Sequence, residues 1–330
     1  MSQNFYLFSP GTLSRKDNSL VFTSTDGVKK FIPIENCESL YCFSEINFNS
    51  KLFNFLGQNQ IHLHFFDYYN NFTGSFSPKK SLLSGSLLIK QVEHYKQIKK
   101  RLVIAKEFVH TATHNILKNV KYYAKKKKEL HDWIEQIQTW KDKIDGAKEI
   151  PELMGIEGNI RKIYYSCWII ILETDISFTK RVYNPPDNPI NAIISFLNGV
   201  LYATCLREIH RTHLDPTISF LHEPGTKRYS LALDIAENFK PVYVDRIIFR
   251  MFNRKQLTMN DFLQELNCCF LKESSSKKVM KEFDDMIKTV IHHPGLDKKV
   301  SYRRLIRLDC YRLVKHILGD APYSGTKSWW

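Results

Sequence analysis

The stretch TGSFSPKKSLLSG, residues 73–85, separates two parts of the sequence that carry different secondary-structure patterns. It is rich in serine and glycine and contains a proline, and these residues favour turns and loops. Aromatic residues are concentrated upstream of it, whereas downstream the apolar positions repeat at helical spacing. We therefore predict two domains in this chain of 330 residues, over residues 1–80 and 81–330.

The N-terminal domain is predicted to be rich in β-sheet. Sixteen of the first 80 residues are Phe or Tyr, against 27 aromatic residues in the other 250. Aromatic side chains favour the half-buried surface of a strand. Residues 20–23 and 31–34 lie on either side of Asp26-Gly27, a pair typical of hairpin turns. Residues 50–56 indicate one short helix that ends at Gly57.

The C-terminal domain is predicted to be all-helical. Apolar side chains recur at helical spacing over residues 87–105, and amphipathic segments continue over 108–145. Five further helices are expected over residues 164–174, 189–210, 230–239, 258–270 and 278–292. The chain end, residues 324–330 (SGTKSWW), lacks such a pattern, and we expect it to be mobile until its tryptophans dock. The predicted fold class is α+β, a small β-rich N-terminal domain followed by a larger all-helical C-terminal domain.

Positive charge is concentrated in one segment of a chain whose formal net charge is +14. Residues 90–128 contain 12 Lys or Arg against 2 Asp or Glu, whereas residues 1–80 contain 7 against 6. A clustered positive field attracts polyanions, so DNA is the favoured partner and a membrane surface the weaker alternative. A solvated helix face is the alternative to phosphate contact. The residues concerned are Lys96, Lys99, Lys100, Arg101, Lys118, Lys121, Lys125, Lys126, Lys127 and Lys128.

Composition argues against several classes of protein. No apolar run reaches the ~18 residues that a membrane span needs, and the first residues lack the basic start and apolar stretch of a secretory signal. The seven cysteines are scattered without a CxxC pair, which argues against a zinc ribbon and for reduced, buried thiols. We expect a soluble protein of the cytoplasm.

A carboxylate lies between two glycines at residues 155–158 (GIEG), before a segment with a helical pattern. Glycine weakens a helix by roughly 0.5–1 kcal/mol relative to alanine, so its presence suggests that something large packs against the backbone there. The alternative is a plain loop and cap, with Glu157 at a helix start where negative charge is favoured. These four residues alone leave both interpretations open.

Residues 214–241 combine one histidine before a Pro-Gly turn with two acids on a predicted helix. Ser230 is a suitable N-cap for that helix, and Asp234 and Glu237 are three residues apart and share one of its faces. Carboxylate oxygens suit Mg²⁺, and the added imidazole of His222 shifts the preference towards Mn²⁺. The alternative is a surface helix with ordinary acidic residues and a capped loop.

Basic residues beside these motifs are candidates for contact with DNA phosphates. Lys227 and Arg228 follow the histidine and its turn, and Arg161 and Lys162 follow the glycine-flanked Glu157.

These motifs belong to an ordered set of blocks that resembles the CRISPR-associated adaptation integrase family, the universal enzyme that inserts new spacers into CRISPR arrays. The blocks are GSFSP, LLSG and QVEHY within residues 74–95, GIEG at 155–158, PPDNPINA and SF within 185–196, LDP and FLHE within 214–223, and SLALDIAE, FKP and DR within 230–246. Each block is short, but their order along nearly the whole chain is specific. The resemblance is greatest to forms found with type I-B systems.

The resemblance implies a metal site for Mg²⁺ or Mn²⁺ made of a glutamate, a histidine and a third acid. Carried over by motif, these are Glu157, His222 and Glu237, with Asp234 as a further ligand or a supporting acid. Two glycines of the family pattern are replaced here, which puts the loop geometry in doubt more than the ligands: they are His213 and Ser219.

The implied activity is joining of DNA, in which the 3′-hydroxyl of a short fragment attacks a phosphodiester at the repeat. The resemblance also implies a homodimer that works with a second, small CRISPR adaptation protein. Two alternatives stay open. One is a metal-dependent endonuclease on branched DNA, since water can replace the sugar hydroxyl as nucleophile. The other is a non-catalytic DNA-binding scaffold.

Overall fold

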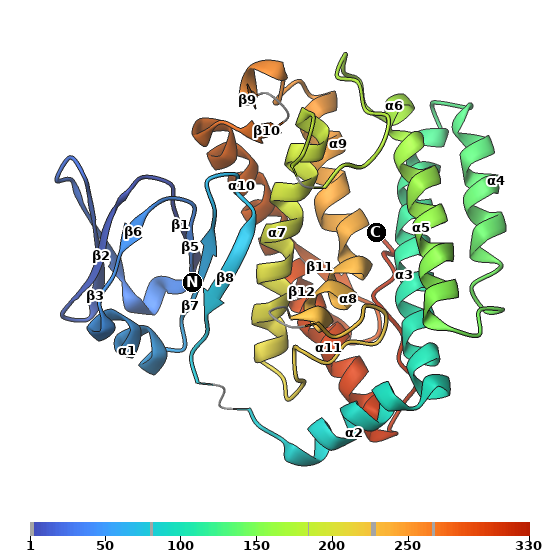
Figure 1. The fold of residues 1–330 in the computed structure, drawn as a ribbon, viewed down its shortest axis with the longest axis horizontal. Helices are drawn as coiled ribbons and strands as arrows, with labels where there is room; N and C mark the ends of the chain where they lie inside the picture. The colour runs from blue at the N-terminus through green and yellow to red at the C-terminus, as the bar shows by residue number, and fades with distance from the viewer. Residues whose placement is uncertain (1–2, 80–81, 184, 226–228, 266–267) are drawn as a thin grey trace. The chain divides into compact units, whose positions relative to one another are not determined.

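The computed structural model describes residues 3–79, 82–183, 185–225, 229–265 and 268–330. The chain forms two compact units, Met1–Ser81 and Leu82–Trp330 (Figure 1). Each unit has its own set of buried apolar side chains, as expected of a part of the chain that folds around a core of its own.

The N-terminal unit consists of two four-stranded sheets and one helix. One sheet has the order β1-β5-β7-β8, formed by Gln3–Leu7, Cys37–Cys42, His62–Phe66 and Phe72–Phe76. The other has the order β4-β3-β2-β6, formed by Lys29–Pro33, Ser19–Ser24, Gly11–Lys16 and Ile46–Asn47. The short turn η1 (Ile34–Asn36) precedes β5, and α1 (Ser50–Gln58) precedes β7.

The predicted hairpin around Asp26-Gly27 is confirmed. Strands β3 and β4 pair antiparallel, with Leu20 opposite Ile32. Gly27 has a φ of 85°, in the left-handed region that glycine adopts without steric cost. A turn residue with this freedom lets the two strands fold back on each other in register.

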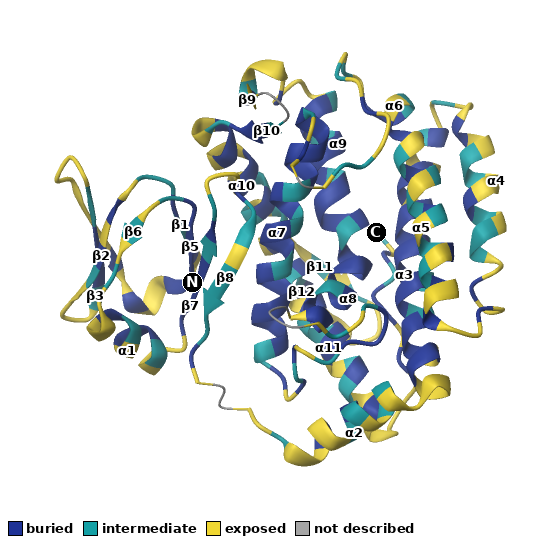
Figure 2. Ribbon diagram, viewed as in Figure 1, coloured by how far each residue is buried: buried dark blue, intermediate teal, exposed yellow. Residues whose placement is uncertain are grey.

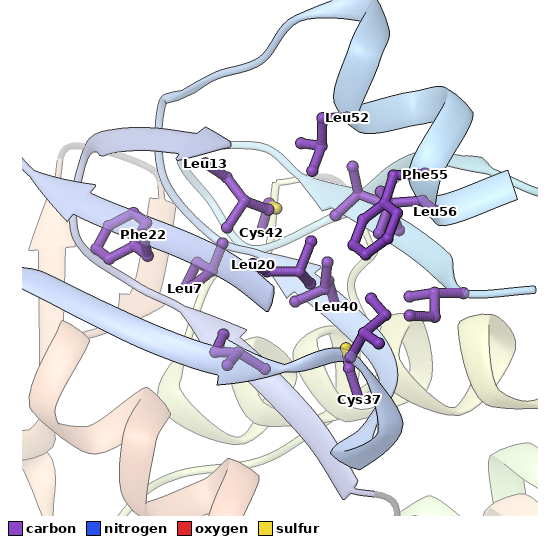
Figure 3. Close-up of a cluster of buried hydrophobic side chains, with 14 residues drawn as sticks. Leu7, Leu13, Leu20, Phe22, Cys37, Leu40, Cys42, Leu52, Phe55 and Leu56 are labelled. Atoms are coloured by element: carbon purple, nitrogen blue, oxygen red, sulfur yellow. The ribbon is translucent and has the colours of Figure 1, made fainter. Parts of the chain in front are cut away.

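Apolar side chains from both sheets and from α1 meet in the core of this unit (Figure 3). Leu13 of β2, Leu20 of β3, Leu40 of β5, and Leu52 and Leu56 of α1 are all fully buried. The predicted helix is therefore present as α1, two residues longer than expected, and it covers apolar surface that the strands would otherwise expose to water.

The C-terminal unit is mainly helical. Three helices pack side by side (Figure 1): α3 (Ile98–Ala124), α4 (Leu130–Lys141) and α5 (Ile150–Ser166). A second group contains α7 (Pro189–His210), α8 (Ser230–Phe239) and α11 (Tyr302–Leu318). The other helical elements are α2 (Gly85–Lys96), α6 (Trp168–Ile171), the π-helical turn η2 (Lys240–Asp245), α9 (Arg246–Asn253), η3 (Met259–Asp261) and α10 (Glu273–Lys288).

Helix α7 is long and apolar enough to cross a membrane by length and composition alone. Nearly all of it is buried among the other helices of the unit (Figure 2). Its start is fixed locally, because the Asn188 side chain accepts a hydrogen bond from the Asn191 N–H at 2.9 Å and Pro189 occupies the first turn. We therefore assign α7 as the core helix of this unit.

The prediction of an all-helical C-terminal domain is wrong in two places. Strands β9 (Phe262–Glu265) and β10 (Cys268–Leu271) form a hairpin where a helix was expected, and β11 (Val290–His293) pairs with β12 (Lys298–Ser301). In the first hairpin the backbone N–H of Cys269 donates to the Pro186 carbonyl at 2.8 Å. A tertiary hydrogen bond of this kind overrides local helical spacing and cannot be read from it.

The chain end is packed, with Trp330 against Tyr302, so the structure shows the docked state of a segment that we expect to be mobile before docking. Thr326 and Ser328 are buried against α3, where the Asn115 amide donates to the Thr326 carbonyl at 3.0 Å and its oxygen accepts from the Ser328 N–H at 2.8 Å. Gly325 lies so close to Thr111 that an added Cβ would come within 2.3 Å of its hydroxyl. Side chains of α3 thus replace the backbone partners that the irregular tail lacks.

Candidate active site

Asp234, on α8, is fully buried and binds the loop that precedes the helix. Its Oδ2 accepts hydrogen bonds from the backbone N–H groups of Phe220 and Leu221 at 2.6 and 3.0 Å. Its Oδ1 accepts from the backbone N–H and the ring Nδ1 of His222, at 3.0 and 2.7 Å. Because a carboxylate only accepts, Nδ1 of His222 carries the proton, and Nε2 of the neutral ring keeps its lone pair.

These four hydrogen bonds engage both oxygens of Asp234. The residue was predicted as a further ligand or a supporting acid, and its contacts fit the second role. It sets the position and the tautomer of His222, as carboxylates behind metal-binding histidines commonly do.

Glu237 lies one turn further along α8 and faces Glu157 of α5 across a shared arginine. Arg161 donates from Nε to Glu157 Oε1 at 3.0 Å and from Nη2 to Glu237 Oε2. The other oxygen of Glu237 accepts from Lys240 Nζ at 2.5 Å. Glu157 and Arg161 are four residues apart and so share one face of α5. We call Glu157, Arg161, His222, Asp234 and Glu237 the α5–α8 site.

The glycine-flanked glutamate lies within α5 and not in a loop, because that helix starts seven residues earlier, at Ile150, with a proline in its first turn. An added Cβ on Gly155 or Gly158 would meet no described atom within 4 Å other than those of its chain neighbours and of the adjacent turns of α5. We expected something large to pack against this backbone; no described part of the chain outside α5 does so, and the expectation stays a prediction.

Exposure differs across the site. The side chains of His222 and Glu157 are 22% and 19% exposed, whereas those of Glu237 and Asp234 are 7% and 0% exposed. A molecule from solution therefore reaches the site from the side of His222 and Glu157.

The environment of the site shifts the pKa values of its two glutamates in opposite directions. Burial opposes ionisation of Glu237, but Lys240 and Arg161 outweigh it and lower the pKa of that carboxyl to about 2. Burial and the negative charge of Glu237 raise the pKa of Glu157, against the opposing effect of Arg161. Burial opposes the imidazolium form of His222, but Asp234 outweighs it, so the pKa of His222 lies above its ordinary value. His222 and Glu237 also attract each other, so the three predicted ligands form one electrostatic cluster.

Among the described residues, no three His, Cys, Asp or Glu side chains stand close enough to form a preassembled metal site. Arg161 accounts for this, since its guanidinium lies between the two glutamates that were predicted as ligands. Arg161 was itself predicted to contact DNA. It is instead largely buried in this ion-pair network, because two carboxylates in a low-dielectric site require a counter-charge.

The loop that carries His222 is held by residues that the sequence did not reveal as part of the site. The Gln91 amide donates to the carbonyls of Asp215 and Ile218 at 3.0 and 2.9 Å, and its oxygen accepts from the Asp215 N–H at 3.0 Å. Arg101, predicted to contact phosphates, is buried and donates to the Phe220 carbonyl at 2.7 Å. The local sequence signal for such a role is a polar residue on an apolar helix face, and Gln91 also begins the block QVEHY.

Two other positions in this loop differ from expectation. Ser230 was predicted as the N-cap of α8, but Tyr229 is the cap residue and the Ser230 hydroxyl donates to the Thr217 carbonyl at 2.8 Å. Ser219, at a position where the family pattern has glycine, donates to the His222 carbonyl at 2.6 Å and so closes the turn. The serine adds a hydrogen bond to the loop that presents the histidine.

The other predicted DNA contacts divide by exposure. Helix α3 ends at Ala124, so Lys125–Lys128 form a turn and not part of a helix. Lys127 is turned away, with Nζ 2.7 Å from the Ile170 carbonyl and 3.3 Å from Glu173. Lys125, Lys126, Lys128 and Lys162 are exposed and stay available. Lys227 and Arg228 lie outside the described residues.

A buried polar network lies behind the two glutamates. The Tyr164 hydroxyl, two turns after Glu157 on α5, donates to Asp245 Oδ2 at 3.0 Å, and the Asn119 amide donates to the Tyr164 oxygen at 3.3 Å. Burial raises the pKa of Asp245 to about 7. This network joins α3 and α5 to the π-helical turn that follows α8.

Comparisons with known proteins show which family has this fold and these motifs. The family model described as CRISPR associated protein Cas1 matches residues 5–285. A curated CRISPR-associated endonuclease Cas1 from Fusobacterium nucleatum is 47% identical over 330 residues, which cover 100% of this chain and 98% of that protein. The Cas1 endonuclease of Haloferax volcanii is 39% identical over 327 residues, which cover 99% of each chain.

Solved structures agree. TM1797, a CAS1 protein from Thermotoga maritima, superposes with a TM-score of 0.88 at 36% identity, over 98% of this chain and 100% of that chain. A casposase bound to its integration product shares the fold, with a TM-score of 0.86 over 98% of this chain and 92% of that chain, at 18% identity. The chain belongs to the CRISPR associated protein Cas1 family.

Proposed function

We propose that this chain is a metal-dependent DNA integrase of CRISPR adaptation, which joins a short DNA fragment to a repeat by transesterification. Relatives named as CRISPR-associated endonucleases align with it over its full length, which supports enzymatic action on DNA. The structural observation that carries the proposal is the α5–α8 site. There, two glutamates from different helices face each other beside a histidine whose Nε2 is left available.

The residues of this site fit a divalent cation. The carboxylates of Glu157 and Glu237 and Nε2 of His222 form an oxygen and nitrogen donor set of the kind that Mg²⁺ or Mn²⁺ takes. Arg161 shows that a positive charge is accommodated between the two acids, and a metal there would displace its guanidinium. Mg²⁺ or Mn²⁺ bound there would polarise the target phosphate and stabilise charge on the attacking and leaving oxygens.

The chain's own residues then position the reactants. Asp234 holds His222 in one orientation, and Arg161 holds Glu157 and Glu237 on facing helices. The exposed lysines Lys162 and Lys126 would contact the DNA backbone without reading its sequence. Such positioning matters because correct geometry alone removes much of the barrier to a reaction between two bound strands.

The proposed reaction needs no energy source. The 3′-oxygen of the fragment forms a bond to phosphorus while the bond from that phosphorus to the 3′-oxygen of the cut strand breaks. The proton of the attacking hydroxyl passes to solvent, and the leaving oxygen takes one up. One phosphodiester bond forms for each one that breaks, so the number of these bonds is unchanged.

We further propose that the chain works as a homodimer with a second, small CRISPR adaptation protein in the prokaryotic cytoplasm. Its family membership supports this assembly. Light scattering of the purified chain, alone and with that partner, tests both interactions. A monomeric mass that the partner leaves unchanged would contradict this part of the proposal.

A gel assay tests the activity. A labelled short duplex with free 3′-hydroxyl ends is mixed with a plasmid that carries the repeat. The chain and its partner protein are added in Mg²⁺, Mn²⁺ or EDTA. We expect labelled fragment joined to the plasmid only with metal. Metal-dependent cleavage without joining would support the endonuclease instead, and binding without strand chemistry in any condition would support the scaffold.

A further inference from the structure

Asp245 is a buried acid that lies behind the two glutamates and is not one of the predicted metal ligands. It ends the π-helical turn η2, which continues from α8, the helix of Glu237. On α5, Arg161 and Tyr164 are three residues apart and share one face. The Tyr164 hydroxyl donates to Asp245 Oδ2 at 3.0 Å. The Asp245 carboxylate therefore lies beside the face of α5 that carries Arg161.

Two buried side chains beside this face have unused capacity for hydrogen bonds. Nη1 of Arg161 is buried and donates to no atom in the described part of the chain. Among the described residues, only the Tyr164 hydroxyl donates to the Asp245 carboxylate, whose two oxygens can accept more than one hydrogen bond. A buried donor without an acceptor costs free energy, so a rearrangement that pairs these two groups would be favourable.

Electrostatic attraction already connects the two side chains. Burial raises the pKa of Asp245 to about 7, and Arg161 is the charge that opposes this shift most strongly. Burial also opposes the charge of Arg161, but Glu237, and to a smaller extent Asp245, help to hold the pKa of Arg161 well above its ordinary value. The guanidinium and the Asp245 carboxylate are therefore within electrostatic range of each other.

The two glutamates hold the arginine in its present position. Its Nε donates to Glu157 Oε1 at 3.0 Å, and its Nη2 donates to Glu237 Oε2. A divalent cation bound to these carboxylates would take both acceptors and would repel the guanidinium. The side chain of Arg161 is only 11% exposed. A buried cation that loses its partners needs another counter-charge, because an unpaired buried charge is costly.

We propose that Asp245 is a positioning residue that receives the Arg161 guanidinium when a metal occupies the α5–α8 site, an inference that rests on the proposed function. Because the donor and the acceptor lie beside one face of α5, rotation of the arginine side chain brings them together. The guanidinium then keeps a charged partner inside the protein. Asp245 thus stabilises the metal-bound site without touching the metal. Solvent is the alternative destination of the guanidinium.

A double-mutant cycle on Mn²⁺ affinity tests the proposal without DNA and without strand chemistry. Mn²⁺ is titrated with each variant at pH 8, and the free ion is measured by its electron paramagnetic resonance signal. Asp245→Asn should weaken Mn²⁺ binding by roughly 10- to 100-fold, because the displaced guanidinium loses its charged acceptor. In the Arg161→Met background, which has no guanidinium to receive, the same substitution should change the affinity by less than about twofold.

Tyr164→Phe is the matched control for a merely structural role of Asp245. It removes the hydrogen bond between α5 and Asp245 but keeps the charge of the carboxylate, so Mn²⁺ affinity should stay near that of the wild-type chain. An equal loss in Tyr164→Phe and in Asp245→Asn would show that Asp245 only ties α5 to η2, and would overturn the proposal. Asp245→Asn also overturns it by weakening Mn²⁺ binding equally with and without Arg161, or by leaving the affinity unchanged.

A structure of the wild-type chain with Mn²⁺ gives a second readout, which holds even if a variant fails to fold. It should show the Arg161 guanidinium within hydrogen-bond distance of the Asp245 carboxylate, and a guanidinium turned to solvent would overturn the proposal. If the wild-type chain binds no Mn²⁺, the metal site of the proposed function fails and this inference falls with it. If the chain binds Mn²⁺ and the substitutions of Arg161 and Asp245 act independently, only this inference fails.

Discussion

The two halves of the α5–α8 site are built in opposite ways. On the histidine side, both oxygens of Asp234 are engaged and the ring of His222 is fixed in position and tautomer. On the acid side, Glu157 and Glu237 are held by Arg161 and Lys240, cations that are not metal ligands. The histidine half thus has a fixed geometry that would suit the proposed metal when the ring is neutral. The acid half already carries a positive charge between its carboxylates, which the proposed metal would have to displace.

The largest expected effect comes from the acid half. Glu157→Gln should reduce strand joining by at least about 10³-fold, equivalent to ~4 kcal/mol in the barrier, because it removes one charged oxygen donor. DNA capture measured by anisotropy should stay within about a factor of three, since the exposed lysines that attract the backbone are untouched. Glu152→Gln, an exposed acid on the same helix, is the matched control. Equal loss of capture and joining would make Glu157 a structural residue.

Removal of the counter-charge should affect stability next most strongly. Arg161→Met should lower the free energy of unfolding by about 3 kcal/mol in EDTA, because it leaves two buried carboxylates with one fewer partner. Urea unfolding in Mn²⁺ should recover part of that loss, since a bound metal supplies the missing charge. Lys162→Met, at the next position but exposed, should change little. The same loss in EDTA and in Mn²⁺ would contradict the exchange of charge.

In the histidine half, substitution of Asp234 should act through the orientation of the His222 ring. In Asp234→Asn the amide offers one acceptor oxygen where the carboxylate offers two, so the His222 ring loses its fixed tautomer. Mn²⁺ affinity and joining should both fall by roughly 10- to 100-fold, as for other residues behind metal ligands. Titration with Mn²⁺ measures the first and the gel assay the second. Unchanged Mn²⁺ affinity would show that Asp234 serves only the fold of the loop.

An effect of a different kind, on the pH dependence of stability, is expected behind the acid half, at Asp245. Burial raises its pKa to about 7, above the unfolded value of about 3.9. The folded state therefore holds a proton that the unfolded state has lost between these values, so stability falls as pH rises towards 7 and levels off above it. The slope contributed is up to about 1.4 kcal/mol per pH unit. Unfolding of Asp245→Asn across pH 5 to 8, compared with wild type, should lack this slope, and parallel curves would contradict it.

Patterns with local causes could be predicted from the sequence. The turn at Asp26-Gly27 and the strands beside it were foreseen, because glycine conformation and the strand preference of aromatic side chains act over a few residues. The shared face of Asp234 and Glu237 follows from helix geometry, and the position of Glu157 came from a family motif. These features need no knowledge of what packs against them.

Features that depend on distant partners could not be predicted. Arg161 and Arg101 look like surface cations in the sequence, yet each lies in an internal network, one between acids of two helices and one against the histidine loop. The chain end lacks any local pattern, and side chains of other elements hold it, among them Asn115 and Glu107 of α3 and Arg312 of α11. In each case a polar side chain binds a backbone group or a charged group that is distant along the chain.

We propose that a divalent metal replaces Arg161 between the two glutamates and beside His222. A crystal structure with Mn²⁺, located by its anomalous scattering, tests this most directly. We predict one peak within roughly 2.4 Å of oxygens of Glu157 and Glu237 and of Nε2 of His222, with the Arg161 guanidinium withdrawn from between the acids. A peak elsewhere, or none while Arg161 still bridges both carboxylates, would contradict the account.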